Sequence, residues 1–264
     1  MAPAFRETTL PNGETIAHLN EYETQFLYEE IYVQEVYLKH VAMLPEDAVF
    51  LDVGANIGLF ALFMCDRFPR ARVICFEPAP QLLAILRHNV ARHGERIVVV
   101  PEGIADRPAT VDFTYYPDYS IMSGFEAHAG RDEALLKRAT ARHLERHGIA
   151  TVDDRILEAL AVSKLRQTQV VKCRVETLSH HIARLGIDRV DLLKVDVERA
   201  ELAVLRGIEA PHWPIIRRVH VEVHDSGELQ QAQLLLEVQG FSLIVEAAPQ
   251  LDGVGVFSIS AWRP

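Results

Sequence analysis

The sequence has few cysteines and no apolar run long enough to cross a membrane. Its 264 residues include three cysteines, an odd number without C-x-x-C spacing. This argues against a disulfide framework and predicts reduced thiols. No apolar run approaches the roughly 18 residues of a membrane helix. The first residues, MAPAFRETTLPNGE, lack an apolar signal core. We therefore expect a cytoplasmic protein that does not bind membranes.

Positive charge is also scarce. There are 27 lysines and arginines against 37 acidic residues, a net charge of −10. Nucleic-acid binding needs a clustered cationic face, so we expect no nucleic-acid partner. The remaining composition is that of a globular protein, with 49% hydrophobic and 24% charged residues. This length predicts a single domain over residues 1–264.

Short apolar runs alternate with helical segments from residue 48 onward. Such alternation predicts an α/β fold, in which right-handed crossovers connect parallel strands. A closing antiparallel pair is expected at residues 241–246 and 254–262. The parallel strands are expected at residues 49–53, 71–77, 97–101, 170–175, 190–195 and 218–224.

Two segments lie outside this alternation of strands and helices: one precedes it and one interrupts it. Residues 1–47 are expected to form an N-terminal helical extension, because apolar residues between positions 21 and 43 recur at helical spacing. Residues 118–169 are too long for an ordinary connection and contain two expected helices, at 132–146 and 154–161. Connections of this length are often lids or binding segments, so we expect a helical insert that covers a site.

The stretch VFLDVGANIGLF, residues 49–60, places a glycine turn at the end of a buried strand. Such a turn is expected to leave backbone N–H groups free for a ligand. A dinucleotide fingerprint has a glycine where Asn56 stands here, so a pyrophosphate fits less well. Asp52 suits an amino group instead. The pattern favours S-adenosylmethionine, with a nicotinamide-dependent oxidoreductase as the alternative.

The next expected strand ends in Phe76 and Glu77. Glu77 lies 19 residues after Gly58 (77 − 58), at the end of the neighbouring strand. An acid at this position can accept both ribose hydroxyls of a nucleoside, and Phe76 can pack on an adenine. The structural alternative is a tight turn beside an ordinary strand-end carboxylate.

At this point the sequence resembles the FkbM-type family of S-adenosylmethionine-dependent methyltransferases. The resemblance lies in LDVGANIG (51–58), FEP (76–78), LLKVDVERAELAVLRG (192–207) and VHVEVHD (219–225). Two further segments resemble the branch of the family found in polyketide and peptide–polyketide pathways: NEYETQFLYEEIY (20–32) and FTYYPDYSIMSGF (113–125). One departure is Arg199, which stands where the family usually has glycine.

The resemblance implies a Rossmann-like class I methyltransferase fold, with a seven-stranded, mostly parallel sheet and an antiparallel last strand. It also implies methyl transfer to oxygen, usually of a hydroxyl. The cofactor residues that it implies are Asp52, Gly54, Asn56 and Gly58 for the methionine part, Glu77 for the ribose, and Gly103 and Ile104 beside the adenine.

Methyl transfer to a hydroxyl requires removal of the acceptor's proton, and a neutral histidine is the usual base near pH 7. Glu222 and His224 lie two residues apart at one strand end, on one face. Asp196 ends the preceding strand, and parallel strand ends open onto one crevice. We predict His224 as the base, oriented by Asp196 or Glu222. The alternative is a structural histidine at a strand end.

The same residues, with Glu198, offer ligands for Mg²⁺, which some O-methyltransferases use to bind the acceptor oxygen. We regard a metal as possible and do not favour it, so no metal ligand is assigned. Lys194 is costly to bury alone, and an ion pair with a nearby carboxylate is expected.

The acceptor is expected to be a hydroxyl of a polyketide or peptide–polyketide natural product. A sugar hydroxyl is the nearest alternative, and a silent binding module is another. Residues 131–148 carry five cations against three acids, which suits docking of an acidic carrier protein that holds the substrate; the alternative is a solvated helix face. The candidate acceptor contacts are Tyr37, Tyr116, Ser123 and Glu198.

Overall fold

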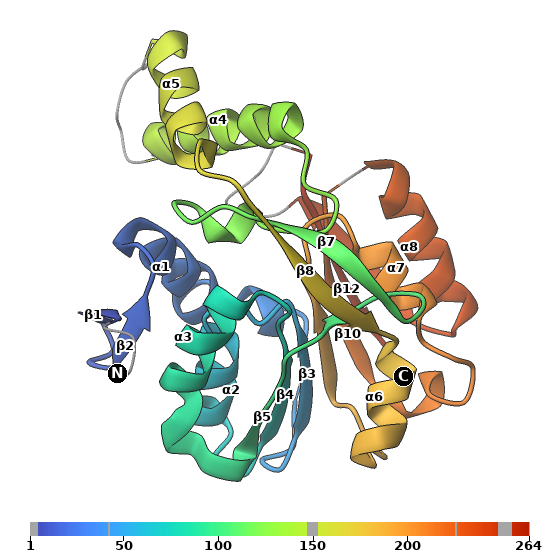
Figure 1. Ribbon diagram of the computed structural model, residues 1–264. Coiled ribbons are helices and arrows are strands. Elements are labelled where there is room, and N and C mark those ends of the chain that lie inside the picture. Colours follow the sequence, from blue (N-terminus) through green and yellow to red (C-terminus); the bar gives the residue numbers. More distant parts are fainter. Residues whose placement is uncertain (1–4, 42, 147–152, 225, 248–254, 264) are drawn as a thin grey trace.

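A seven-stranded sheet forms the centre of the protein (Figure 1). The computed structural model describes residues 5–41, 43–146, 153–224, 226–247 and 255–263. The sheet has the order β11-β12-β10-β9-β3-β4-β5. Its strands are β3 (Val49–Val53), β4 (Arg72–Phe76), β5 (Ile97–Val100), β9 (Leu192–Val195), β10 (Arg218–Val223), β11 (Ser242–Ala247) and β12 (Phe257–Trp262).

Strand directions confirm the predicted fold class. The neighbours β5, β4, β3, β9 and β10 pair in parallel. The last strand, β12, lies between β10 and β11 and is antiparallel to both. This is the mostly parallel sheet with an antiparallel last strand that the sequence predicted.

Helices cover both faces of the sheet (Figure 1). One face packs on α2 (Leu59–Arg67) and α3 (Pro80–Val90), and the other on α6 (Leu178–Leu185), α7 (Glu201–Arg206) and α8 (Ser226–Val238). Alternate residues of one strand enter the two cores: Phe50 joins the first, and Leu51 and Val53 the second. Because both faces are buried, the central strands are mostly apolar, and the polar residues within them, such as Asp52 and Lys194, are buried as well.

The expectation that residues 170–175 return to the main sheet is wrong. They belong to β8 (Gln169–Glu176), which forms a separate sheet with β7 (Ala109–Tyr115) and the short β6 (Gly103–Ile104). In β8 only Cys173 and Val175 are buried, between charged Lys172 and Arg174. This alternation is that of a strand with one solvated face, unlike the buried strands of the main sheet.

The two flanking segments contain the expected helices and more. The N-terminal segment starts with a hairpin of β1 (Arg6–Thr9) and β2 (Thr15–His18). It continues as α1 (Glu21–Tyr28), a π-helix η1 (Glu29–Val33) and a 3₁₀ turn η2 (Val36–Leu38). The first part of this segment is thus a β-hairpin, and its helices begin at Glu21.

The insert contains a 3₁₀ turn η4 (Ser120–Met122), then α4 (Ala129–Arg146) and α5 (Asp154–Leu165). Figure 1 shows α4 and α5 side by side beyond the sheet, away from the layers that α2 and α6 form. Within the described residues, none of the helices has the length and apolarity to cross a membrane.

Candidate active site

A cavity of about 320 Å³ opens where β3, β4, β9 and β10 end, and α4 covers it. Its volume is typical of small-molecule sites. The turn after β3 and the end of β4 line one end, which we call the cofactor end. The ends of β9 and β10, with α1, η1, η4 and α4, line the other, which we call the acceptor end. Polar residues of the lining include Asn56, Glu77, Asp196, Glu198, Glu222 and His224.

The glycine turn is pressed against the end of β9. Gly54 has a φ of +84°, and a Cβ at this position would lie 1.9 Å from the carbonyl oxygen of Asp196. A Cβ at Gly58 would lie 2.7 Å from Cδ1 of Leu86 in α3. Gly54 therefore lets two backbone segments meet beside the cavity. Gly58 lets α2 approach α3, and it is not among the lining residues.

The turn's N–H groups are bonded, which contradicts the expectation that they are free. Gly54 and Ala55 both donate to the carbonyl of Phe76, each at 3.1 Å. The Asn56 N–H donates to Oε2 of Glu77 at 2.9 Å. The sequence could not show this, because the acceptors belong to the neighbouring strand β4 and its end. What faces a ligand here is the Glu77 carboxylate.

Glu77 is buried and fixed by two backbone donors. Its Oε1 accepts from the N–H of Ala79 at 2.9 Å, while Oε2 accepts from Asn56. Burial raises the pKa of Glu77 to about 7, although both hydrogen bonds oppose this. Each oxygen keeps lone-pair capacity for a further donor, such as a ribose hydroxyl. Phe76, Gly103 and Ile104 line the cavity nearby.

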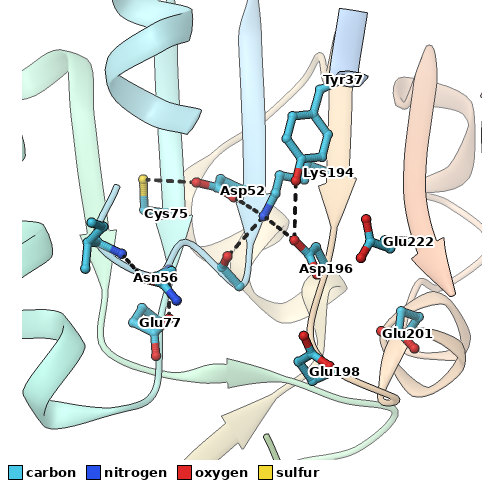
Figure 2. Close-up of polar contacts among 12 residues, drawn as sticks. Tyr37, Asp52, Asn56, Cys75, Glu77, Lys194, Asp196, Glu198, Glu201 and Glu222 are labelled. Atoms are coloured by element: carbon cyan, nitrogen blue, oxygen red, sulfur yellow. Dashed lines mark hydrogen bonds and ion pairs between the residues drawn. The ribbon is translucent and has the colours of Figure 1, made fainter. Parts of the chain in front are cut away.

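Asp52 is fully buried in β3 and is not among the residues that line the cavity. Figure 2 shows its carboxylate next to Lys194. Nζ of Lys194 is 3.0 Å from Oδ1 of Asp52 and donates to the carbonyl of Gly54 at 3.0 Å. It is also 3.7 Å from Oδ2 of Asp196. Burial lowers the pKa of Lys194, but the two carboxylates outweigh burial and raise it. The predicted ion pair of Lys194 is confirmed, and the structure shows Asp52 supporting the turn.

Three carboxylates surround His224 at the acceptor end. Its Nδ1 is 2.9 Å from Oε1 of Glu201, and its Nε2 is 3.3 Å from Glu222 and 3.4 Å from Glu198. Burial lowers the pKa of His224, but these carboxylates outweigh burial and raise it well above the usual value. These carboxylates therefore favour the protonated imidazole, and the role of His224 as the base stays a prediction.

Glu201 is a contact of His224 that the sequence reasoning did not identify. It is fully buried in the first turn of α7 and pairs with Nδ1 of His224, while Glu222, one of the two expected orienting residues, lies 3.3 Å from Nε2. The available signal was an acidic residue at a helix start directly after a strand, where the helix dipole favours it. Sequence alone does not show that this side chain turns toward the end of β10.

The carboxyl groups of Glu198, Glu222 and Asp196 lie around one space. Burial, together with Asp196 and Glu222, raises the pKa of Glu198 to about 8, although His224 opposes this. Burial and Asp196 likewise raise the pKa of Glu222. The Tyr37 hydroxyl donates to Oδ2 of Asp196 at 3.3 Å (Figure 2). Asp196 is the most exposed of these three carboxylates, with 24% of its side chain accessible.

The same cluster has the spacing of a possible metal site. Ligand atoms of Asp196, Glu198 and His224 all lie within 4.8 Å of one another. Two carboxylates and one imidazole suit Mn²⁺, Fe²⁺ or Zn²⁺ better than Mg²⁺, which prefers oxygen ligands. His224 would have to lose its proton to bind a metal. The Mg²⁺ alternative stays a prediction.

The structure brings three of the four candidate acceptor contacts to the cavity. Tyr37, Ser123 and Glu198 line it. Tyr116 stands outside the lining, and its hydroxyl donates to Oδ2 of Asp132 in α4 at 2.9 Å. The Tyr116 N–H donates to the Ser123 hydroxyl at 3.0 Å. Tyr116 therefore supports the cavity wall.

Comparisons with known proteins agree on a family. The methyltransferase FkbM domain matches residues 52–243. The 31-O-demethyl-FK506 methyltransferase FkbM of Streptomyces tacrolimicus is 40% identical over 266 residues, which cover 100% of this chain and 99% of that protein. The methyltransferase sdnD of Sordaria araneosa is 34% identical over 236 residues, 87% of this chain and 86% of that protein.

A longer relative and a solved structure add to this. The AMB antimetabolite synthetase AmbE of Pseudomonas aeruginosa is 38% identical over 269 residues; the match covers 99% of this chain but spans only 13% of AmbE. A crystal structure of the methyltransferase FkbM from Methylobacillus flagellatus covers 92% of this chain and 55% of that one, with a TM-score of 0.53 and 14% identity. That likeness concerns the fold alone.

Proposed function

This chain belongs to the FkbM family of methyltransferases, and from that premise we propose that it moves a methyl group from S-adenosylmethionine to a hydroxyl oxygen of a natural product. One observation carries the proposal. A single cavity contains Glu77 at the cofactor end and the cluster of Asp196, Glu222 and His224 at the acceptor end. A nucleoside-bearing donor and a hydroxyl acceptor can therefore meet in one enclosed space.

The cofactor end suits the nucleoside part of the donor. The Glu77 carboxylate would accept hydrogen bonds from the ribose, with Phe76, Gly103 and Ile104 beside the adenine. Gly54 and Asn56 would face the methionine part, while Asp52 and Lys194 hold the turn from below. When bound, S-adenosylmethionine supplies an electrophilic methyl group on a positively charged sulfur. The excess of carboxylates at the acceptor end favours that positive charge.

The acceptor end would take the hydroxyl proton as the new oxygen–carbon bond forms. Three carboxylates around His224 favour its protonated form, so we propose that a neighbouring carboxylate receives the acceptor's proton. Asp196 is the strongest candidate, because it is partly exposed to the cavity and its position is fixed by Tyr37 and Lys194. His224 would hold Glu198 and Glu222 in place and balance their charge.

The acceptor class rests on the relatives and on the lining. The relative from Streptomyces tacrolimicus is named for an O-demethyl form of FK506, and AmbE for an antimetabolite synthetase. Phe26, Met122, Leu135 and Leu136 form an apolar part of the cavity wall, which supports an acceptor with a large apolar portion. We propose a polyketide or peptide–polyketide hydroxyl, free or bound to a carrier protein, with a sugar hydroxyl as the alternative.

A thermal-shift experiment tests the cofactor first. S-adenosylhomocysteine and NAD are compared, each with and without EDTA, and a ligand at a hundred times its dissociation constant stabilises by about 2.7 kcal/mol. We expect a shift with S-adenosylhomocysteine only, lost in Glu77→Ala and kept in the surface control Glu46→Ala. A shift with NAD alone would refute the proposal. An EDTA-sensitive shift would establish the metal alternative.

A transfer assay then tests the acceptor. Labelled S-adenosylmethionine is incubated with 31-O-demethyl-FK506, other hydroxylated polyketides and simple glycosides, and products are identified by mass spectrometry. We expect methylation of a polyketide hydroxyl, and a loss of at least a hundredfold in turnover in Asp196→Asn. Methylation of glycosides alone would replace the polyketide by a sugar acceptor.

A further inference from the structure

Arg199 connects the insert to the loop between β9 and α7. Glu198 and Arg199 both have positive φ values, +55° and +76°. A left-handed backbone costs roughly 1–2 kcal/mol at a residue other than glycine. The Arg199 guanidinium compensates for this by reaching α4, where its Nη1 is 2.5 Å from Oδ1 of Asp132.

This ion pair is almost completely enclosed. Asp132 is fully buried, and 9% of the Arg199 side chain is exposed. The second oxygen of Asp132 accepts from the Tyr116 hydroxyl and from the His128 N–H, each at 2.9 Å. Both carboxylate oxygens are therefore occupied. Removing one partner would leave the other charge buried and uncompensated, which is strongly destabilising.

The backbone of Arg199 contacts the catalytic cluster. Its N–H donates to Oε1 of Glu201 at 3.0 Å, and the same oxygen is 2.9 Å from Nδ1 of His224. One turn beyond Asp132, Leu135 and Leu136 line the acceptor end of the cavity. Arg199 thus joins the α4 wall of the cavity to the residue that orients His224.

We propose that Arg199 is a positioning residue that couples closure of α4 over the acceptor to the alignment of His224. In the closed state, which is the state of this structure, Arg199 and Asp132 form their ion pair. When α4 moves away to admit an acceptor, the pair breaks, and Arg199 no longer holds its loop, so Glu201 loses its fixed donor. Closure restores the pair and with it the position of Glu201 and His224. This inference rests on the proposed function of the same cavity.

Two measurements on the whole protein with S-adenosylhomocysteine bound test the coupling. Hydrogen exchange reports the opening of residues 132–141 in α4. Nuclear magnetic resonance of the histidine rings, with the His224 signal assigned from a His224→Gln sample, reports its alignment. The variants are Arg199→Met, Asp132→Asn, the milder Tyr116→Phe and the conservative Arg199→Lys. Lys137→Gln is the control, because Lys137 pairs with Asp154 and Glu158 inside the insert.

We expect exchange in α4 to rise at least tenfold in Arg199→Met and Asp132→Asn, less in Tyr116→Phe, and to be partly restored in Arg199→Lys. The His224 signal should shift in the same order, including in Asp132→Asn, whose altered side chain lies on α4. The control should change neither. If the two disruptive variants unfold, the same order must appear in Tyr116→Phe and Arg199→Lys.

Two results would overturn the coupling. One is unchanged exchange of α4 in Arg199→Met. The other is an Asp132→Asn variant that opens α4 and leaves the His224 signal in place, because insert and cluster would then be independent. Failure of the proposed function looks different: the wild-type protein would not bind S-adenosylhomocysteine by calorimetry. The exchange and resonance comparisons would still be interpretable in the free protein.

Discussion

The cofactor end and the acceptor end of the cavity are built in different ways. The cofactor end is mostly backbone: a short turn whose N–H groups bond to Phe76 and Glu77 at the end of the adjacent strand. The acceptor end is a set of side chains from β9, β10, η1 and α4, held together by charged contacts. One end thus depends on backbone pairing between two adjacent strands, and the other on side-chain packing between segments far apart in the sequence.

A single cation lies between the two ends. Lys194 is 3.0 Å from Asp52 under the glycine turn and 3.7 Å from Asp196 at the acceptor end. The close approach of Gly54 to the carbonyl of Asp196 joins the same two ends through the backbone. A change at this junction should therefore damage both ends, whereas a change elsewhere should damage one.

The largest effect is expected for Gly54→Ala. The new Cβ would clash with the carbonyl of Asp196, and alanine is strained at a φ of +84°. Strain of roughly 1–2 kcal/mol and overpacking of roughly 1–3 kcal/mol together predict a loss of about 2–5 kcal/mol in the free energy of unfolding. Urea unfolding measures the loss, and calorimetry should show loss of S-adenosylhomocysteine binding.

Gly186→Ala is the matched control for backbone strain. Gly186 has a φ of +61°, and a Cβ there would meet nothing within 4 Å. Its loss of stability should be about 1 kcal/mol, with ligand binding unchanged. Equal losses in the two variants would show that the contact between the turn and β9 does not matter. The two ends would then be independent.

The sequence predicts the parts of this molecule whose signals are local. Apolar runs identified the buried strands, and the glycine spacing located the turn. The insert helix α5 begins at Asp154, as expected, because Asp153 caps it. The ion pair of Lys194 was predictable because a buried ammonium group needs a carboxylate.

The missed features depend on register and on distant side chains. The turn's N–H groups are bonded because Val53 lies opposite Phe76 across the β3–β4 pair, which the sequence does not state. The raised pKa of His224 results from three carboxylates on separate segments. Arg199 was visible as a departure from the family pattern, but its partner Asp132 lies 67 residues earlier (199 − 132).

A smaller effect is expected in the pH dependence of stability, which ligand binding should change at the cofactor end and leave unchanged at the acceptor end. The pKa of Glu77 is raised to about 7 in the folded protein, against 4.5 for an ordinary glutamate. Its contribution to stability is therefore complete below about pH 4.5 and is lost as pH rises toward 7. The difference in stability between wild type and Glu77→Gln should fall across this window by at most about 3 kcal/mol.

Glu23 in α1, whose carboxylate accepts from Ser120 of the acceptor end, provides the comparison, because burial raises its pKa to about 7 as well. Hydrogen bonds from a ribose would favour the charged form of Glu77 and lower its pKa. S-adenosylhomocysteine should therefore shift the pH range over which the stability difference between wild type and Glu77→Gln falls to lower pH. The corresponding pH range for Glu23→Gln should stay unchanged. Denaturant unfolding from pH 4 to 8, with and without ligand, measures both. A shift of both pH ranges on ligand binding would contradict the separation of the two ends.

The smallest effect is expected for Ser120→Ala, which tests whether the acceptor end can be weakened alone. The Ser120 hydroxyl donates to Oε2 of Glu23 at 2.9 Å, and both residues are buried. Its loss should cost about 1–2 kcal/mol in the free energy of unfolding and raise the pKa of Glu23 further, because the hydrogen bond favours the carboxylate. Binding of S-adenosylhomocysteine should be unchanged, since the cofactor end keeps its backbone hydrogen bonds.

Ser163→Ala, which removes an exposed hydroxyl on α5, is the control and should change neither the free energy of unfolding nor ligand binding. A tenfold loss of ligand affinity in Ser120→Ala would mean that the acceptor end shapes the cofactor end through more than the junction at Lys194 and Gly54.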